Sequence, residues 1–445
     1  MRIGGPLIVN NLAVAGMHFA DTVMAGRLGA DALAAVAVGG SVWFLGFTLC
    51  MGTLMAISPI AARHYGAGDF GLIGRYTRQG IYLALVAGLV LILVGQFVVE
   101  PLLTTIGIDP EFRYLTVSYV AAIIFGAPGI FVFLALRFTT EGIGHTRPIM
   151  YTSLLALLCN VILNYALMFG HFGAPALGVV GCGIASAITM WVVALTLATH
   201  MIFASRYREL LIFSRVAPLR PSVLKEIIVL GIPIAITITA EAGLFSAVSI
   251  LMGTRGTLIT AAHQIAISFS STIFMVPLAL SAATTIAVGQ LLGKGDMRNA
   301  RLAGATGIFL CSVIMSISAM TLLVFRDAIV GIYTDDVAVK GIAISLLLMA
   351  AIFQIADGVQ IGAAGALRGY KDTRVPMVIN IFSFWVLAFP LAYMAAVTYK
   401  APPSYVWGGF VLGLTVAAVL LTWRYYRLSK AYLGMSPGMF GDSSP

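Results

Sequence analysis

Twelve stretches of about 20 apolar residues, almost free of charge, run through this 445-residue chain. A bilayer-spanning segment must satisfy its own backbone hydrogen bonds, so continuous apolar runs predict helices rather than the alternating strands of a barrel. In agreement, 60% of the residues are hydrophobic and only 10% are charged, against roughly 25% charged in soluble proteins. The sequence therefore predicts an all-α polytopic membrane protein and excludes soluble and disordered chains. The expected spans are residues 3–24, 34–61, 81–99, 117–136, 149–169, 176–203, 227–252, 261–288, 303–325, 341–367, 375–398 and 406–423.

The lysine and arginine residues predict the orientation of these spans. When the connectors are assigned to alternating sides, 20 of the 26 basic residues fall on one side and six on the other. The positive-inside rule then places both termini in the cytoplasm. The net charge of +9 is explained by this topology, and no basic run with interleaved aromatics occurs, so we expect no nucleic-acid partner. The four cysteines lie in apolar runs without a CxxC pair and are expected to be packing residues.

The chain repeats itself at an offset of 227 residues. Gly66-Ala-Gly-Asp69 meets Gly293-Lys-Gly-Asp296, and His145-Thr-Arg147 meets Asp372-Thr-Arg374. Six spans per half make the repeat parallel, with a binding cavity between the halves. We predict an N-terminal six-helix lobe at 1–204, a cytoplasmic connector at 205–225, a C-terminal six-helix lobe at 226–430 and a cytoplasmic tail at 431–445.

One motif in the first repeat has a misleading form. Gly66, Gly68 and Gly71 satisfy the GxGxxG pattern of dinucleotide-binding proteins. They lie in a connector between two spans, with no preceding strand, so we predict a tight turn between helices.

Three acidic residues fall inside the expected spans: Asp21, Glu241 and Asp357. A charged side chain near the bilayer centre costs roughly 2.5–3.5 kcal/mol on insertion scales, and no lysine or arginine falls clearly within a span to pair with them. We expect these acids to face an aqueous cavity, bind a cation or carry a proton. The alternative is an acid that caps a packed interface. None of the three meets another acid at the 227-residue offset, so the scaffold is duplicated but the acids are not, which favours a functional role.

Polar neighbours predict a cluster around Asp21. Asn10 lies 11 residues before it, about three helical turns, and should share its face. His18 lies one turn away, and we prefer a satisfied core histidine to a proton relay for this residue. In the fifth span Asn160 and Asn164 form an i, i+4 pair of amides that need partners or an ion in hydrocarbon.

A second cluster is predicted in the other half of the chain. Thr237 lies one turn before Glu241, and Gln354, Asp357 and Gln360 form a strip at i, i+3 and i+6. If the two faces converge, the two carboxylates should share a proton or hold a cation. Hard oxygen ligands in this number suit Na⁺.

These features resemble the multidrug and toxic compound extrusion (MATE) family, and most of all its bacterial NorM branch, over nearly the whole chain. The most specific pieces are Ala20-Asp-Thr-Val-Met-Ala-Gly26, Gln354-Ile-Ala-Asp-Gly-Val-Gln360 and Ala366-Leu-Arg-Gly-Tyr-Lys-Asp-Thr373. The resemblance implies twelve helices in two six-helix bundles. It also implies a secondary antiporter of the bacterial inner membrane that expels cationic, amphipathic drugs in exchange for Na⁺ or H⁺. The chain begins almost inside its first span, without the family's usual cytoplasmic leader.

The resemblance also carries over to individual residues. Asp21 with Asn160 and Asn164 matches the family's N-lobe cation or proton site, and Glu241 and Asp357 match the acids proposed for a C-lobe site. We expect Na⁺ as the coupling ion, with H⁺ as the open alternative, and no cofactor or metal beyond Na⁺ at the C-lobe pair. The expected partners are small cationic molecules and the lipid bilayer, and we expect a monomer.

Three other functions were weighed. A flippase of lipid-linked saccharides from the same superfamily is the runner-up, but its anionic substrate would call for basic residues in the cavity. A major-facilitator transporter would usually carry a GxxxDRxGRR-like loop, which residues 63–69 do not match. An intramembrane enzyme would need HExxH, GxSxG or clustered His and Cys, and these patterns do not appear, so we expect no enzymatic activity.

Overall fold

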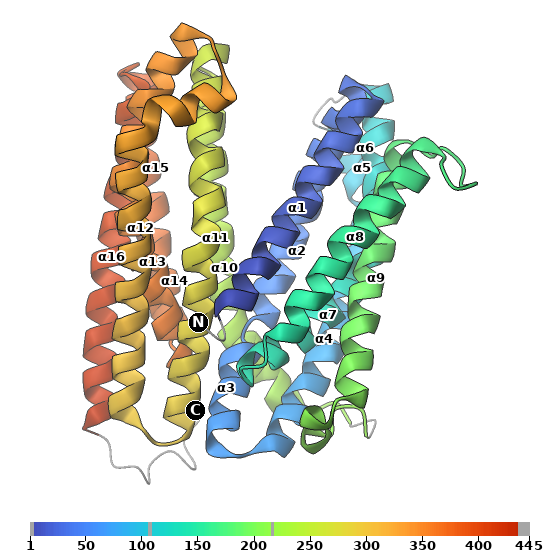
Figure 1. Ribbon diagram of the computed structural model, residues 1–445, viewed down its shortest axis with the longest axis vertical. Coiled ribbons are helices and arrows are strands. Elements are labelled where there is room, and N and C mark those ends of the chain that lie inside the picture. Colours follow the sequence, from blue (N-terminus) through green and yellow to red (C-terminus); the bar gives the residue numbers. More distant parts are fainter. Residues whose placement is uncertain (1–3, 106–108, 215–217, 435–445) are drawn as a thin grey trace. The chain divides into compact units, whose positions relative to one another are not determined.

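The computed structural model of the chain describes residues 4–105, 109–214 and 218–434 (Figure 1). The regular structure of these residues is helical throughout, without a strand. Twelve helical segments are long and apolar enough to cross a membrane. The predicted fold class and number of spans are therefore confirmed for the described part of the chain. The last helix ends at Leu433, and most of the predicted tail lies outside the described residues.

The chain divides into two compact units, Met1–Ala235 and Ile236–Pro445. The first unit contains the helices α1 (Gly4–Leu28), α2 (Ala30–Leu54), α3 (Ile57–Ala67), α4 (Phe70–Phe97), α5 (Val99–Thr105), α6 (Pro110–Ile123), η1 (Ile124–Gly126), α7 (Ala127–Gly142), α8 (Arg147–Phe169), α9 (Val179–Phe203) and η2 (Ser205–Leu210). Helix α10 (Pro221–Gly253) begins in the first unit and continues into the second.

The second unit holds the remainder of α10 and the helices that follow it. They are α11 (Thr257–Gly293), α12 (Met297–Tyr333), α13 (Val337–Gly369), α14 (Arg374–Ile381), the π-helical η3 (Phe382–Ala388), α15 (Phe389–Tyr393), the π-helical η4 (Met394–Thr398) and α16 (Pro403–Leu433). Helix α13 packs against α11, α12 and α16, so it forms the centre of this unit.

The helix boundaries reproduce the sequence repeat. The starts of α2 and α11, α4 and α12, α6 and α13, and α8 and α14 each lie 227 residues apart, at Ala30 and Thr257, Phe70 and Met297, Pro110 and Val337, and Arg147 and Arg374. Equal spacing of the turns and caps fixes equal helix lengths, so the two halves of the chain present the same order of spans.

The glycine motif at residues 66–71 is a turn between helices, as predicted. Helix α3 ends at Ala67 and α4 begins at Phe70, so two residues connect them. Gly68 has a φ of 81°, in the left-handed region where glycine is favoured. Its repeat counterpart, Gly295, has a φ of 76°. The glycines therefore serve the chain reversal rather than a phosphate.

The chain that leads into α10 is held by the first turns of α4. The buried side chain of Gln79 donates to the Pro218 carbonyl at 3.0 Å and accepts from the Arg220 backbone N–H at 3.0 Å. An amide that satisfies two backbone groups in this way fixes both the position and the direction of the segment. The start of α10 is thereby attached to the first unit.

An aromatic cluster fills the core of the second unit. The rings of Phe245 and Phe410 stack with their centroids 4.7 Å apart, and Phe353 and Trp407 complete the cluster at 5.6 Å from each other. Phe353 and Trp407 are buried, so their contribution is mainly removal of apolar surface from the surroundings. This cluster fixes α10, α13 and α16 against one another.

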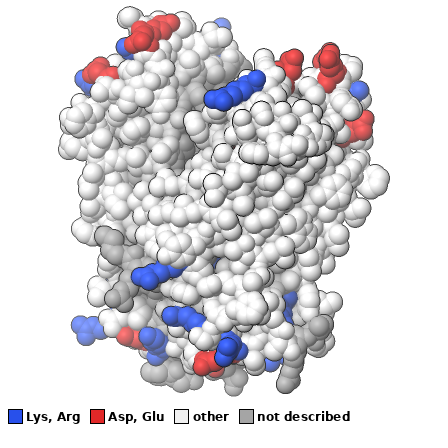
Figure 2. Space-filling view, turned by 45° about the vertical axis from the view of Figure 1, so that its right-hand side comes forward, with Lys and Arg blue, Asp and Glu red and all other residues white. Residues whose placement is uncertain are grey.

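Charged side chains lie near the helix ends on the face that Figure 2 shows, with an uncharged band of surface between them. An uncharged band along the middle of long helices is the surface that hydrocarbon requires. The surface thus agrees with the membrane assignment made from composition.

The contact between α12 and α16 gives a test of the packing. A Cβ atom at Gly304 would lie 2.6 Å from the Tyr425 Oη, and this buried hydroxyl donates to the Arg301 carbonyl. Gly304→Ala should therefore displace Tyr425 and destabilise the protein by about 1–3 kcal/mol, measured as a lower melting temperature in detergent. Gly331→Ala on the same helix is the control, because a Cβ there meets nothing within 4 Å. Equal melting temperatures for the two variants would contradict this packing.

Candidate functional site

The first unit brings Asp21 together with the two amides predicted to accompany it. Asn164 Nδ2, on α8, donates to Asp21 Oδ1 at 2.6 Å and lies 3.3 Å from Asn160 Oδ1. Both asparagines are buried. Asn164 Oδ1 is buried without a hydrogen-bond partner among the described residues. The cluster thus offers a carboxylate and an open amide oxygen to a proton or a small cation.

His18 lies one turn from Asp21 on α1 and interacts electrostatically with it. Its side chain is exposed, so the interpretation as a satisfied core histidine is wrong. The sequence could not distinguish these cases, because which face of α1 is covered depends on the neighbouring helices.

Asn10 shares the α8-facing side of α1 with Asp21, but it belongs to a separate polar layer. Its amide hydrogen-bonds with the Ser153 hydroxyl on α8. In the amide orientation that satisfies both neighbours, its oxygen accepts from Arg137 Nη2 at 3.1 Å. Asn10 and Asp21 contact positions on α8 that are 11 residues apart, so the two layers are separated by about three turns.

A buried ion pair completes the Asn10 layer. Arg137 Nε lies 2.7 Å from Glu141 Oε1 on α7, and the Glu141 side chain is only 3% exposed. Sequence analysis assigned Glu141 to the cytoplasmic side, outside the spans, whereas the structure places it in the last turn of a membrane-spanning helix. The i, i+4 spacing of arginine and glutamate was the signal that could have identified the pair.

The second unit brings together the two acids predicted there. Glu241 on α10 interacts electrostatically with Asp357 on α13 and accepts a hydrogen bond from the Gln360 amide. Asp357 is 4% exposed, and its Oδ1 and the Gln360 Oε1 are buried without hydrogen-bond partners in the described part of the chain. Two unpartnered oxygens beside paired carboxylates form an arrangement that a monovalent cation or a proton can complete.

The other two predicted residues lie at the margin of this acid cluster. Gln354 Oε1 accepts from the Ser318 hydroxyl on α12 at 2.9 Å, which directs the amide toward α12. Thr237 lies one turn before Glu241 on α10 and is half-buried. Gln354 therefore supports the packing of α12 on α13 beside the acids.

A basic residue within the membrane-spanning part of α13 was missed by sequence analysis. The expectation that no lysine or arginine lies in a span is wrong, because α13 continues to Gly369 and includes Arg368, which is 9% exposed. Its Nη2 donates to Ser281 Oγ at 2.8 Å and its Nε to the Ala364 carbonyl at 3.3 Å. The guanidinium also interacts electrostatically with Glu241.

His263 was not singled out in the sequence, and its hydrogen bonds show that it is neutral. Trp407 Nε1, which can only donate, lies 3.1 Å from His263 Nδ1. The imidazole proton must therefore be on Nε2, 2.9 Å from the Ser249 hydroxyl. A buried imidazole with both nitrogens engaged in this way is a structural element of the aromatic cluster.

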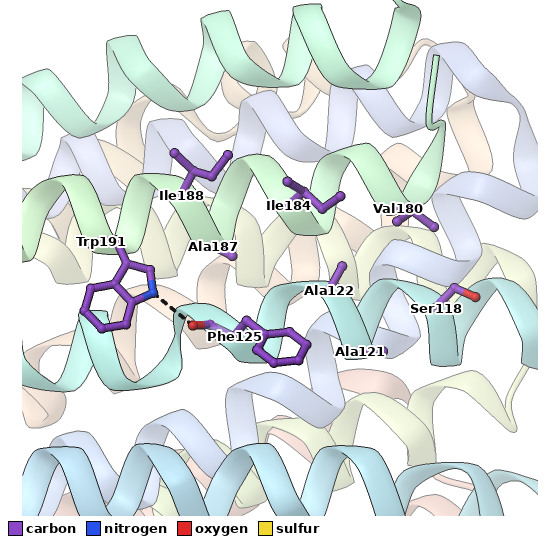
Figure 3. A pocket seen from close by; sticks show the side chains of 9 residues that line it. All are labelled: Ser118, Ala121, Ala122, Phe125, Val180, Ile184, Ala187, Ile188 and Trp191. Atoms are coloured by element: carbon purple, nitrogen blue, oxygen red, sulfur yellow. Dashed lines mark hydrogen bonds between the residues drawn. The ribbon is translucent and has the colours of Figure 1, made fainter. Parts of the chain in front are cut away.

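Two pockets in the structure are distinct from both acid clusters. One, of about 540 Å³, lies between α6, η1 and α9 and is almost wholly apolar. Figure 3 shows the Trp191 Nε1 donating to the Phe125 carbonyl, at 3.0 Å, beside it. The other, of about 680 Å³, lies among α12, α13 and α16 and is also apolar. Neither is lined by any of the predicted site residues, so the candidate chemistry lies in the acid clusters.

Comparison with known proteins shows what the chain resembles. The MatE family model matches residues 6–166 and 233–394, two stretches whose starts are 227 residues apart. Multidrug resistance protein PmpM of Pseudomonas aeruginosa is 38% identical over 437 residues, covering 97% of this chain and 92% of that protein. Multidrug resistance protein NorM of Aliivibrio fischeri is 36% identical over 434 residues, covering 97% and 94%. The crystal structure of the eukaryotic MATE transporter AtDTX14 shares the fold, with a TM-score of 0.85 at 21% identity over 97% of this chain and 96% of that one.

The Arg137–Glu141 pair gives a prediction about stability. Arg137→Gln leaves the buried Glu141 carboxylate without its cation, which should cost about 3–5 kcal/mol and lower the melting temperature of the purified protein. The control is Arg326→Gln, because Arg326 Nε is 3.7 Å from the exposed Asp327 carboxylate, and exposed pairs contribute about 0–1 kcal/mol. Similar losses in the two variants would show that the buried pair is not structural.

Proposed function

The chain belongs to the MatE family of multidrug efflux transporters, and we propose that it is a secondary antiporter that exports cationic, amphipathic compounds in exchange for Na⁺ or H⁺. The observation that carries the proposal is the presence of two separate acid clusters inside membrane-spanning helices, one in each unit. Each has buried oxygen atoms that lack partners among the described residues. Carboxylates kept at such a cost within a span are expected to bind what is transported or what drives the transport.

The charge of the clusters favours cationic substrates. Asp21, Glu241 and Asp357 supply negative charge, whereas the two arginines found within spans, Arg137 and Arg368, interact with Glu141 and Glu241. Positive side chains engaged by acids offer little to an anionic substrate. This argument replaces the simpler one that basic residues are absent from the spans, and it keeps a flippase of lipid-linked saccharides as the second candidate.

Alternating access would couple the two fluxes. If the driving ion and the drug favour opposite-facing states of the protein, binding of one promotes release of the other across the cycle. Excess lysine and arginine on one side supports an orientation with both termini in the cytoplasm. We propose that the transporter works in this way as a monomer in the bacterial inner membrane.

The Asp21 cluster is proposed to bind a cation or proton in the first unit. Asp21→Asn keeps the hydrogen-bonding size of the side chain but cannot ionise, so it should abolish efflux of a fluorescent cation such as ethidium from cells lacking other pumps. Asp31→Asn is the control, since Asp31 is an exposed acid at the start of α2. Near-wild-type efflux by Asp21→Asn at equal membrane abundance would contradict the assignment.

The acid cluster of the second unit is proposed to bind Na⁺ through Glu241 and Asp357, because neutral oxygen groups surround the carboxylates. An imposed Na⁺ gradient at equal pH on both sides should drive drug transport in proteoliposomes, and Asp357→Asn should remove this response. The control is Asp335→Asn, an exposed acid of the same unit. Transport driven only by a pH gradient, with any Na⁺ response unchanged in Asp357→Asn, would leave the pair as at most a proton site.

A further inference from the structure

Arg368 is the one strongly basic group close to the acid cluster of the second unit in the described structure, and the proposed function does not yet use it. A guanidinium stays charged at any physiological pH, so its burial requires compensation. Its two hydrogen bonds go to neutral acceptors, Ser281 Oγ and the Ala364 carbonyl. These bonds hold the group in place but do not neutralise it. The compensating charge must come from the acids nearby, of which Glu241 interacts with it.

The direction of the Arg368 side chain brings it toward the acids. Its Nε bonds to the carbonyl four residues earlier, so the side chain extends toward the N-terminal end of α13, as is usual for long side chains on helices. Asp357 lies in that direction on the same helix. Beyond the acids, Phe245 follows Glu241 by one turn and Phe353 precedes Asp357 by one turn, with ring centroids 6.4 Å apart. The acids thus lie between a guanidinium and an aromatic contact.

The charges of this cluster leave a single negative charge when both acids are ionised. Two carboxylates and one guanidinium sum to −1, which one Na⁺ or one proton neutralises. Without the guanidinium the same two carboxylates would present −2, and in a buried site their mutual repulsion would favour binding of a cation much more strongly.

The first unit reaches the same net charge by a different route. The polar groups that act on Asp21 are Asn164, Asn160 and His18, none of which carries a fixed positive charge. Asp21 alone therefore gives −1. The repeat position of Arg368 in the first unit is Glu141, an acid, and it is neutralised by Arg137 in another layer. The two units differ in every charged residue, yet each acid cluster has one uncompensated negative charge.

We propose that Arg368 is a built-in counter-charge that limits the Glu241–Asp357 cluster to one monovalent cation and keeps its affinity low enough for release. Ser281 acts with it as a positioning residue, because its hydroxyl accepts from the guanidinium while donating to the Ile361 carbonyl at 2.7 Å. This inference rests on the cation-coupled function proposed above and adds the residue that sets its stoichiometry.

The test is equilibrium binding of radioactive Na⁺ to the purified full-length protein at one fixed pH. An Asp21→Asn background confines the measurement to the second unit. The reference protein should bind one Na⁺, and further Asp357→Asn should abolish the binding. Arg368→Gln should tighten binding about tenfold or more, whereas Arg368→Lys should stay close to the reference. Ser281→Ala should weaken binding, because the freed guanidinium can turn toward Glu241 and compete with Na⁺.

The opposite signs expected for Arg368→Gln and Ser281→Ala separate this role from a structural one, since general damage to the site would weaken binding in both. Arg424→Gln is the control: this arginine of the same unit pairs with Asp372 at 2.7 Å and should leave Na⁺ binding unchanged. Unchanged or weaker binding in Arg368→Gln, with a normal reference, would overturn the inference alone. A reference protein that binds no Na⁺ would overturn the Na⁺ assignment of the proposed function, and this inference with it.

Discussion

Each peptide group inside a bilayer must find its hydrogen-bond partner within the protein, because hydrocarbon offers none. This requirement forces the chain into long helices and leaves only side chains to vary. It also makes every ionisable side chain within a helix costly, so such a group persists only with compensation. The helical architecture, the uncharged band on the surface and the few charged residues in the interior all follow from this one constraint.

Charge compensation takes a different form at each buried ionisable group. Glu141 has an adjacent arginine on its own helix, at 2.7 Å. Asp21 has amides, of which Asn164 donates at 2.6 Å. Glu241 and Asp357 lie close enough to interact and have both an amide and a guanidinium near them. Only the Glu141 pair is neutral by itself. The other clusters keep a net negative charge, and a group that is incompletely compensated can respond to a cation.

The repeat separates scaffold from chemistry. Helix starts recur at 227 residues because turns and caps determine where spans begin, and both halves need spans of the same length. Side chains inside the spans face no such requirement. Glu141 and Arg368 occupy equivalent positions with opposite charges, each in the last turn of its span. A duplicated scaffold can therefore carry two unlike sites.

The sequence by itself determined the class of protein, the number of spans, the repeat and the three acids at the centre of the clusters. These properties depend on local composition and spacing, which a single chain records directly. Only the tertiary structure decided the partners. Arg368 joined the acids because α13 extends past the apolar run and its side chain turns back along the helix. Asn10 bonds to Ser153 rather than to the Asp21 cluster, and His18 is exposed, because those outcomes depend on which face of α1 meets α8. Contacts between helices far apart in sequence are set by packing, and no local pattern encodes them.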